Sequence, residues 1–189
     1  MASIGGDRRI TAFLDLIAAS EGTSSSPVTK SDGYDIIVSG IKGHNRFDDF
    51  SAHPFAGGRS PILVREAKEP VQAVTDPYTG FVLHPSKPAV TALRSTASGR
   101  YQITLETWRE LAAVLHLKLF NPSCQDSAAM ELLFKHQADQ LLLQGKCAEA
   151  ILTCNKVWAS FPGNKYGQGG RSLDWLISTY HTMLSGQEA

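Results

Sequence analysis

One carboxylic acid near the N-terminus, Glu21, stands where its surroundings should change its chemistry. Ile10, Leu14 and Ile17 are spaced four and three residues apart, which predicts one apolar stripe on a helix. Glu21 falls four residues further along that stripe. Gly22 should end the helix, because glycine is favoured just past a helix C-terminus. Burial and the negative pole of the helix both disfavour a carboxylate, so they should raise the pKa of Glu21.

A carboxyl group that stays protonated near neutral pH can act as a general acid, above all at the oxygen of a glycosidic bond. The pattern alone fits a second interpretation, a surface glutamate that happens to precede a C-cap glycine. The rest of the chain is needed to decide between the two.

Other kinds of chemistry find less support. The six histidines are scattered, and no cysteine or histidine pair has the spacing of a structural zinc site, so we expect no metal and no cofactor. His44, Asp48 and His53 could suggest a metal peptidase, but no further ligand pattern accompanies them, and solvated polar side chains are expected there. Cys147 and Cys154 are seven residues apart in a helical pattern, about 10.5 Å along the axis, which is too far for a disulfide. Reduced, buried thiols are therefore expected.

Composition bounds the class of protein. A chain of 189 residues suits a single domain, and 42% hydrophobic with 19% charged residues is typical of a globular protein. Lysine plus arginine and aspartate plus glutamate both number 18, which argues against nucleic acid or an anionic membrane as the main partner. The apolar run 13–19 contains Asp15 and has no small-residue cleavage pattern, so neither a signal peptide nor a membrane span is expected.

The first half of the chain predicts one helix and a small sheet. After the helix, residues 22–33 are rich in Ser, Thr, Gly and Asp and predict a loop, and residues 34–38 predict a strand of a small antiparallel sheet. Six of the nine prolines lie between residues 53 and 88. This predicts a long loop or a β-ribbon, inserted at about residues 54–91 of a single domain that spans 1–189.

Helices should dominate the second half. Thr104 is a predicted N-cap, and Ser123 with Asp126 resembles a capping box for a helix that runs to about Leu143. Further helices are expected from about 147 to 160 and from Ser172 onward. The expected fold class is α+β, a mainly helical lobe with a small sheet and a cleft between them.

Several short blocks, in the same order along the chain, resemble the bacteriophage lambda endolysin family. They span most of the sequence, and the Trp-Ala-Ser-x-Pro-Gly and Gly-Arg-Tyr-Gln runs are the most specific. The blocks are Phe13-Leu14-Asp15, Ser20-Glu21-Gly22-Thr23, residues 33–38, residues 98–102, residues 123–126, residues 155–163 and Tyr166-Gly167-Gln168.

The resemblance implies a lysozyme-like fold and a peptidoglycan lytic transglycosylase. Such enzymes cleave the MurNAc–GlcNAc β-1,4 bond and leave 1,6-anhydro-MurNAc ends. The catalytic acid of the family maps onto Glu21, in agreement with the pKa argument, and Asp35 should lie near the cleft in a supporting role. Because the C6 hydroxyl of the substrate takes the place of water, one carboxyl group can suffice where hydrolases need two.

The resemblance also suggests residues that contact the glycan. For Tyr101 and Gln102, a turn with a buried tyrosine is the alternative, and Trp158 is expected in the core rather than as a sugar platform. The residues expected to bind substrate are Tyr34, Arg100, Tyr101, Gln102, Tyr166 and Gln168.

The resemblance leads us to expect a monomeric phage endolysin for host cell lysis. It should stay in the host cytoplasm until a separate holin permeabilises the membrane. Its partner would be the glycan strand of peptidoglycan, without nucleic acid and without membrane insertion. Two alternatives stay open: a hydrolytic muramidase in which Asp35 positions water, and a catalytically inactive glycan-binding domain. The presence of Glu21 argues against the second.

Overall fold

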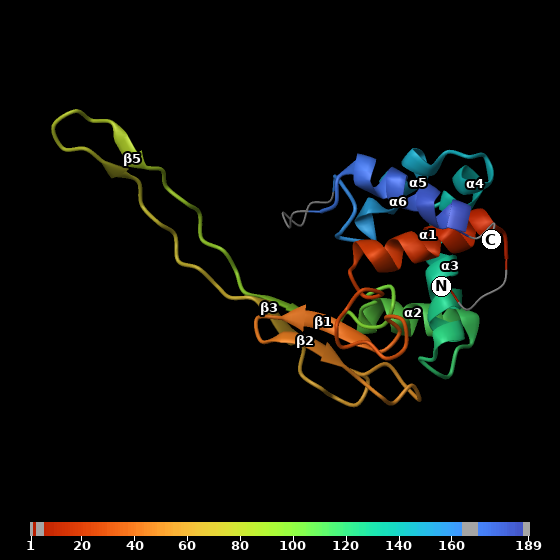
Figure 1. Cartoon of the computed structure of the whole chain (residues 1–189). Coiled ribbons are helices and arrows are strands. Elements are labelled where there is room, and N and C mark those ends of the chain that lie inside the picture. The colour runs from red at the N-terminus through yellow and green to blue at the C-terminus, as the bar shows by residue number, and fades with distance from the viewer. Residues whose placement is uncertain (1, 3–5, 164–169, 187–189) are drawn as a thin grey trace.

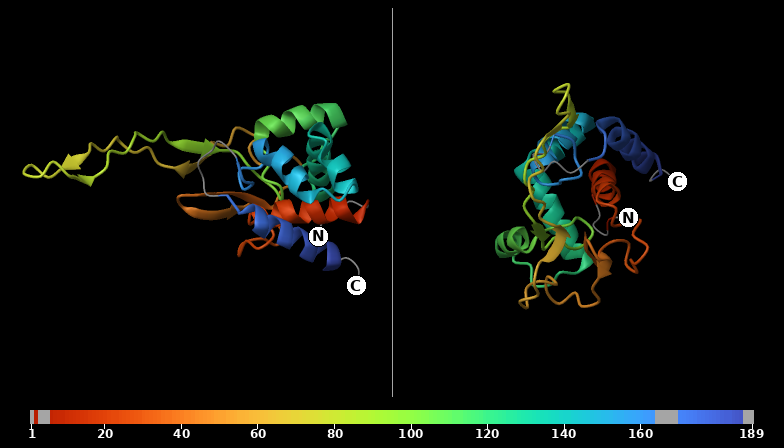
Figure 2. Two further views of the ribbon diagram at one scale, coloured as in Figure 1. Left: turned by 90° about the horizontal axis from the view of Figure 1, so that it is seen from above. Right: turned by 90° about the vertical axis from the view of Figure 1, so that its left-hand side faces the viewer.

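The computed structural model describes residues 2, 6–163 and 170–186. It consists of a body, in which helices surround α1 and a small sheet lies at one end, and a long two-stranded arm that leaves the sheet end (Figure 1). The views in Figure 2 show that the arm stands clear of the helical lobe. The expected α+β class is confirmed.

Helix α1 (Arg8–Ser20) is the centre of the body. The Asp7 side chain caps its start by accepting from the backbone N–H of Arg9. The predicted stripe of Ile10, Leu14 and Ile17 is buried, but so are residues on the other faces, including Phe13. Because α1 packs against α6, α4 and α3, it is apolar nearly all round.

The predicted strand lies two residues later than expected. Strand β1 (Ile36–Gly40) pairs antiparallel with β2 (Gly43–Arg46). The base of the arm packs closely against this hairpin at Gly40. A side chain would not fit there, because a Cβ atom on Gly40 would lie 2.4 Å from Cγ2 of Ile62. The backbone N–H of Ile41 donates to Leu63 O at 3.0 Å, so the base of the arm continues the edge of the small sheet.

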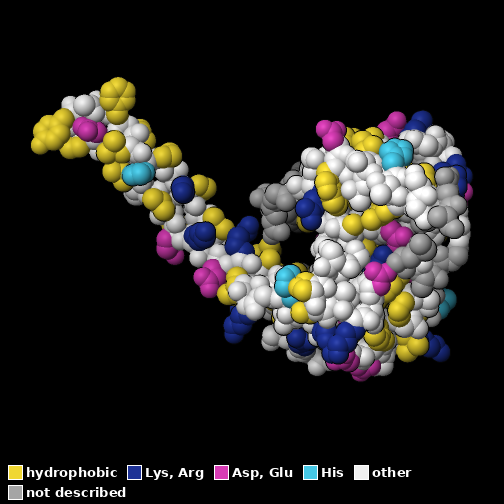
Figure 3. Space-filling model, viewed as in Figure 1, with side chains coloured by type: hydrophobic (Ala, Val, Ile, Leu, Met, Phe, Trp, Pro, Cys, Tyr) yellow, Lys and Arg dark blue, Asp and Glu magenta, His cyan; other side chains and the backbone are white. Residues whose placement is uncertain are grey.

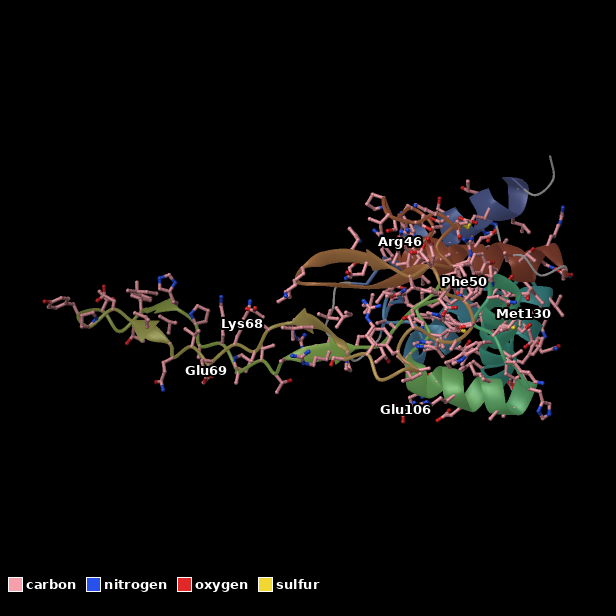
Figure 4. The ribbon with its side chains drawn as sticks, turned by 90° about the horizontal axis from the view of Figure 1, so that it is seen from below. Arg46, Phe50, Lys68, Glu69, Glu106 and Met130 are labelled. Atoms are coloured by element: carbon pink, nitrogen blue, oxygen red, sulfur yellow. The ribbon has the colours of Figure 1, made fainter. Side chains whose placement is uncertain are left out.

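The proline-rich segment forms the arm, and it is a β-ribbon. Its base pairs β3 (Ile62–Arg65) with β6 (Leu93–Ser95), and its tip pairs β4 (Val74–Thr75) with β5 (Val82–His84). Lys68 and Glu69 lie on its shaft, far from Phe50 and Met130 in the body (Figure 4). The arm begins later than the sequence suggested, because His53 and Phe55 are buried in the core.

Shortening the arm should leave the fold intact. No residue from 62 to 96 is fully buried, and Lys68 and Val90 already face each other through two backbone hydrogen bonds of 2.8 and 2.9 Å. We expect that replacing residues 69–89 by a short glycine-containing turn shifts Tm by less than about 3 °C, because little apolar surface is lost. Calorimetry measures the shift. A control deletion from Gly57, which removes the half-buried Ile62, should be clearly destabilising; a large Tm loss in the first variant would show that the arm supports the body.

The predicted helix from 123 to 143 is two helices. Helix α2 (Leu105–Leu115) is capped by Thr104, as expected. Helix α3 (Pro122–Lys135) is capped by Asn121, whose side chain accepts from Cys124 N–H, so the expected capping box is wrong. Asp126, the acidic residue of the expected capping box, is instead buried in the core. Gln137, with a φ of 56°, breaks the helix before α4 (Ala138–Leu143), which turns to pack on α1.

The last helices complete the lobe. Helix α5 (Cys147–Thr153) passes into a short 3-10 helix η1 (Cys154–Lys156), earlier than the expected end at 160, because Trp158 and Phe161 turn into the core. Helix α6 (Leu173–Gly186) follows. The prediction that Trp158 belongs to the core is confirmed.

All three cysteines are free thiols in the structure. Cys147 and Cys154 are buried, and Cys124 is only half-buried. Among the described helices, none is long and apolar enough to cross a membrane.

Candidate active site

The end of α1 fixes the position of Glu21. Glu21 is the C-cap residue, and Gly22 follows with a φ of 72°. The N–H of Gly22 donates to Ala19 O and the N–H of Thr23 donates to Ala18 O, which is the Schellman arrangement. The Thr23 hydroxyl also contacts Arg100 O at 2.6 Å, so the turn is tied to a distant segment. The carboxyl therefore stands on a rigid support.

The carboxyl group of Glu21 lies against protein on one side and a pocket on the other. Ser160 Oγ donates to Glu21 Oε1 at 2.7 Å. Burial raises the pKa of Glu21, and the hydrogen bonds from Ser160 oppose that rise. The direction is the one that the sequence predicted, and burial is its main cause.

The pocket is a cleft between the sheet and the helical lobe. Two adjoining cavities include Glu21. The small sheet and the arm base contribute Val38 and Val64, and the segment after η1 contributes Trp158. The surface is hollowed where the arm base faces the lobe (Figure 3). A partly apolar cleft with one carboxylic acid suits a group that must be protonated away from water.

Asp35 does not line these cavities. It is buried with 1% exposure, and its carboxylate accepts from Thr29 Oγ1 at 2.5 Å and Lys30 N–H at 2.8 Å. Arg46 approaches it to 3.9 Å. These contacts hold the loop that precedes β1, so any support that Asp35 gives to the cleft passes through that loop.

Replacing Asp35 by Asn should slow lysis much less than replacing Glu21. Asparagine keeps one oxygen acceptor for the loop but loses the charge and the second acceptor, so we expect a loss of less than about tenfold. Turbidity loss of cell-wall suspensions measures it, with calorimetry to check folding. If Asp35→Asn and Glu21→Gln lose equal activity while both stay folded, a two-carboxylate mechanism is favoured.

Three of the expected glycan contacts are interior groups, which corrects the expectation. Tyr34 and Tyr101 are 4% and 1% exposed, and their hydroxyls donate to Asp126 Oδ1 at 2.7 and 2.6 Å. Burial raises the pKa of Tyr34 to about 12. Arg100 is 2% exposed and pairs with Asp15 at 2.8 Å and Asp32 at 2.9 Å. The two tyrosine hydroxyls bind α3 through Asp126, and Arg100 binds α1 through Asp15, so these side chains hold the body together.

Gln102 is the expected binding residue that does reach the cleft. It lines both cavities beside Glu21, with a φ of 51° and its Nε2 donating to Gly99 O at 3.0 Å. A left-handed backbone at a residue other than glycine is a strained conformation of the kind that gathers at functional sites. Tyr166 and Gln168 lie outside the described residues.

Sequence reasoning missed two polar residues of the site: Ser160, which contacts the acid, and His44, which lines the cleft. Ser160 lies 139 positions from Glu21, so no local pattern links them. His44, from β2, lines the cleft and its Nδ1 lies 2.8 Å from Ser39 Oγ.

The expectation of a solvated His53 is wrong. His53 is buried against Phe120, and its Nε2 donates to Ile103 O at 3.1 Å. Burial lowers the pKa of His53 to about 4.

Comparison with known proteins gives one consistent result. Residues 11–76 and 69–187 match the family described as endolysin. The endolysin of Escherichia phage P2 is 36% identical over 183 residues, 96% of each chain, and that of Escherichia phage lambda is 33% identical over 95% of this chain and 92% of its own. A structure of bacteriophage lambda lysozyme complexed with a chitohexasaccharide matches with a TM-score of 0.73 and 30% identity, over 95% of this chain and 96% of that one.

Proposed function

The chain belongs to the endolysin family and is a peptidoglycan-degrading enzyme with the lysozyme fold, and from that premise we propose that it is a lytic transglycosylase. It would cleave the MurNAc–GlcNAc β-1,4 bond of the glycan strand and leave 1,6-anhydro-MurNAc ends, without consuming water.

One observation carries this proposal. Among the described residues that line the two cavities, Glu21 is the single carboxylic acid. Hydrolases that retain or invert configuration need a second carboxyl group, as nucleophile or as the base that activates water. The carboxylate of Asp35 accepts hydrogen bonds from the loop before β1, and Asp35 lines neither cavity. A cleft with one acid supports a reaction in which the substrate supplies the second nucleophile.

The reaction balances with Glu21 alone. Its acid form gives a proton to the glycosidic oxygen, the C1–O bond of MurNAc breaks, and the GlcNAc end leaves as an alcohol. The N-acetyl group of MurNAc stabilises the positive charge at C1. The C6 hydroxyl of the same sugar then bonds to C1, and its proton returns to the carboxylate of Glu21. The enzyme ends in its starting state, and no water is added.

The other cleft residues would bind and shield the sugar. Val38, Val64 and Trp158 offer an apolar wall that keeps water from the reacting carbon. Gln102 offers an amide beside the acid, suited to a hydrogen bond with an acetamido or hydroxyl group. The similar bacteriophage lambda lysozyme was solved in complex with a chitohexasaccharide, which supports a glycan as the substrate of this chain.

Mass spectrometry of digested, purified peptidoglycan tests the proposal. If the C6 hydroxyl attacks, each new end is one water lighter than a hydrolysed end and cannot be reduced by borohydride. We expect such anhydro ends as the main product. A digest dominated by reducible muramic acid would replace the transglycosylase by a muramidase that uses water.

The site of action is also a proposal. The protein would accumulate in the host cytoplasm and reach the wall only after a separate holin opens the membrane. Expression in a Gram-negative host, with and without a membrane permeabiliser added, tests this. Rapid lysis is expected only with the permeabiliser, and lysis without it would require another export route.

A further inference from the structure

Two serine hydroxyls form a line behind the acid. Ser160 Oγ lies 2.7 Å from Glu21 Oε1, Ser20 Oγ lies 2.9 Å from Ser160 Oγ, and Ser20 Oγ lies 2.8 Å from Ile17 O. All three distances are those of good hydrogen bonds. The line therefore connects the carboxyl group in the cleft to a backbone carbonyl of α1.

Each hydroxyl has one proton to donate, so the hydrogen bonds along this line can run in either of two directions. In the first, Ser20 donates to Ser160 and Ser160 donates to Oε1, which suits a carboxylate. In the second, before substrate is protonated, the protonated Oε1 of Glu21 donates to Ser160, Ser160 donates to Ser20, and Ser20 donates to Ile17 O, which suits the carboxylic acid. The O–H of Glu21 then turns from Ser160 toward the glycosidic oxygen, and Ser160 can donate to the carboxylate that is left. No heavy atom has to move between the two.

We propose that Ser160 and Ser20 form a hydroxyl relay whose direction reverses with the protonation of Glu21. The relay holds the carboxyl in one place as acid and as base. This rests on the proposed function, in which Glu21 gives up a proton and takes one back in each turnover. Ser160 and Ser20 are positioning residues, since they act through Glu21.

The backbone around Ser160 is also tied down by a hydrogen bond. Arg171 N–H donates to Ser160 O at 2.8 Å. Gly170 allows this approach, because a Cβ there would lie 2.9 Å from Ser160 O. The contact between Ser160 and Glu21 therefore joins two fixed segments, as a relay with constant distances requires.

Removing the Ser160 hydroxyl should change how Glu21 titrates. Ser160 can bond to both forms of Glu21, but its hydrogen bond to the charged carboxylate is the stronger one and opposes the effect of burial, so its loss should raise the pKa of Glu21 further. Because the first step needs the acid form, the high-pH limb of kcat/KM should move to higher pH while the maximum falls by roughly tenfold. The other charged or titratable side chains lining the cleft, within the described chain, are His44 from β2 and Arg94 from β6.

The test is the pH profile of kcat/KM on soluble peptidoglycan fragments. Ser160→Ala should move the high-pH limb to higher pH, Ser160→Thr should restore it, and Ser20→Ala should move it less in the same direction. The remote Ser127→Ala, a serine bonded within α3, serves as the control and should leave the limb in place. An unmoved limb in Ser160→Ala, or an equal movement in Ser127→Ala, overturns the relay.

A direct measurement keeps the relay testable if the Ser160→Ala variant folds poorly. The ¹³C chemical shift of the Glu21 carboxyl, titrated in wild type and in Ser20→Ala, should report a higher midpoint in the variant; equal midpoints overturn the relay. A failure of the proposed function can be distinguished from a failure of the relay. Reducing ends from the wild type would reject transglycosylation while a moved limb still supports the relay, and anhydro ends with an unmoved limb would reject the relay alone.

Discussion

Replacing Glu21 by Gln is expected to reduce the rate of wall lysis by at least about a hundredfold, the typical scale for an acid–base group. Glutamine has nearly the same shape, and its amide oxygen can still accept from Ser160, but it has no proton to give to a glycosidic oxygen. Turbidity loss and the release of soluble muropeptides measure the rate. A variant that lyses cell wall at a near wild-type rate would remove Glu21 from the mechanism.

The same variant should be at least as stable as the wild type at neutral pH. Because burial raises the pKa of Glu21, the folded state holds a proton more firmly than the unfolded state does. Stability is then lost as pH rises from the ordinary glutamate pKa through the raised one, and it stays lower above that range. Gln carries no such cost, so the Tm advantage of Glu21→Gln should appear near pH 7 and vanish toward pH 4. Lost activity with a lower Tm at pH 7 would instead indicate a damaged fold.

The parts of the site that could be predicted from the sequence are those set by local periodicity. The spacing from Ile10 to Glu21 places the acid at the end of a buried helix, and Gly22 marks that end. The contact with Ser160 could not be predicted, because packing of the lobe, not any local pattern, brings residues 139 positions apart together.

The misassigned residues have a common cause. From the sequence, the hydroxyl groups of Tyr34 and Tyr101 are expected to bind substrate. In the structure both donate to one buried carboxylate, Asp126. For the same reason the local pattern assigns Asp126 to a helix cap, although the core uses it. A polar side chain is available to substrate only if the core does not need it, and that depends on partners distant in sequence.

Replacing Arg100 tests whether its side chain serves the core or the substrate, because only a role in the core predicts a large loss of stability. Replacing it by Met keeps much of its apolar length but removes the cation that pairs with Asp15 inside the body. Breaking a buried pair on one side costs about 3–5 kcal/mol, so Tm should fall by roughly 10 °C or more. Arg9→Met, which breaks the more exposed pair with Asp7, is the matched control and should cost at most about 1 kcal/mol.

The two possible roles of Arg100 separate when activity is measured below the melting range. If Arg100 ties the sheet to α1, the folded fraction of Arg100→Met should keep most of the wild-type kcat/KM at low temperature and lose it as the protein melts. If Arg100 contacted the glycan, KM would rise while Tm stayed unchanged. The exposed fraction of 2% and the two ion pairs favour the first outcome, in which the most specific motif of the chain acts through the core.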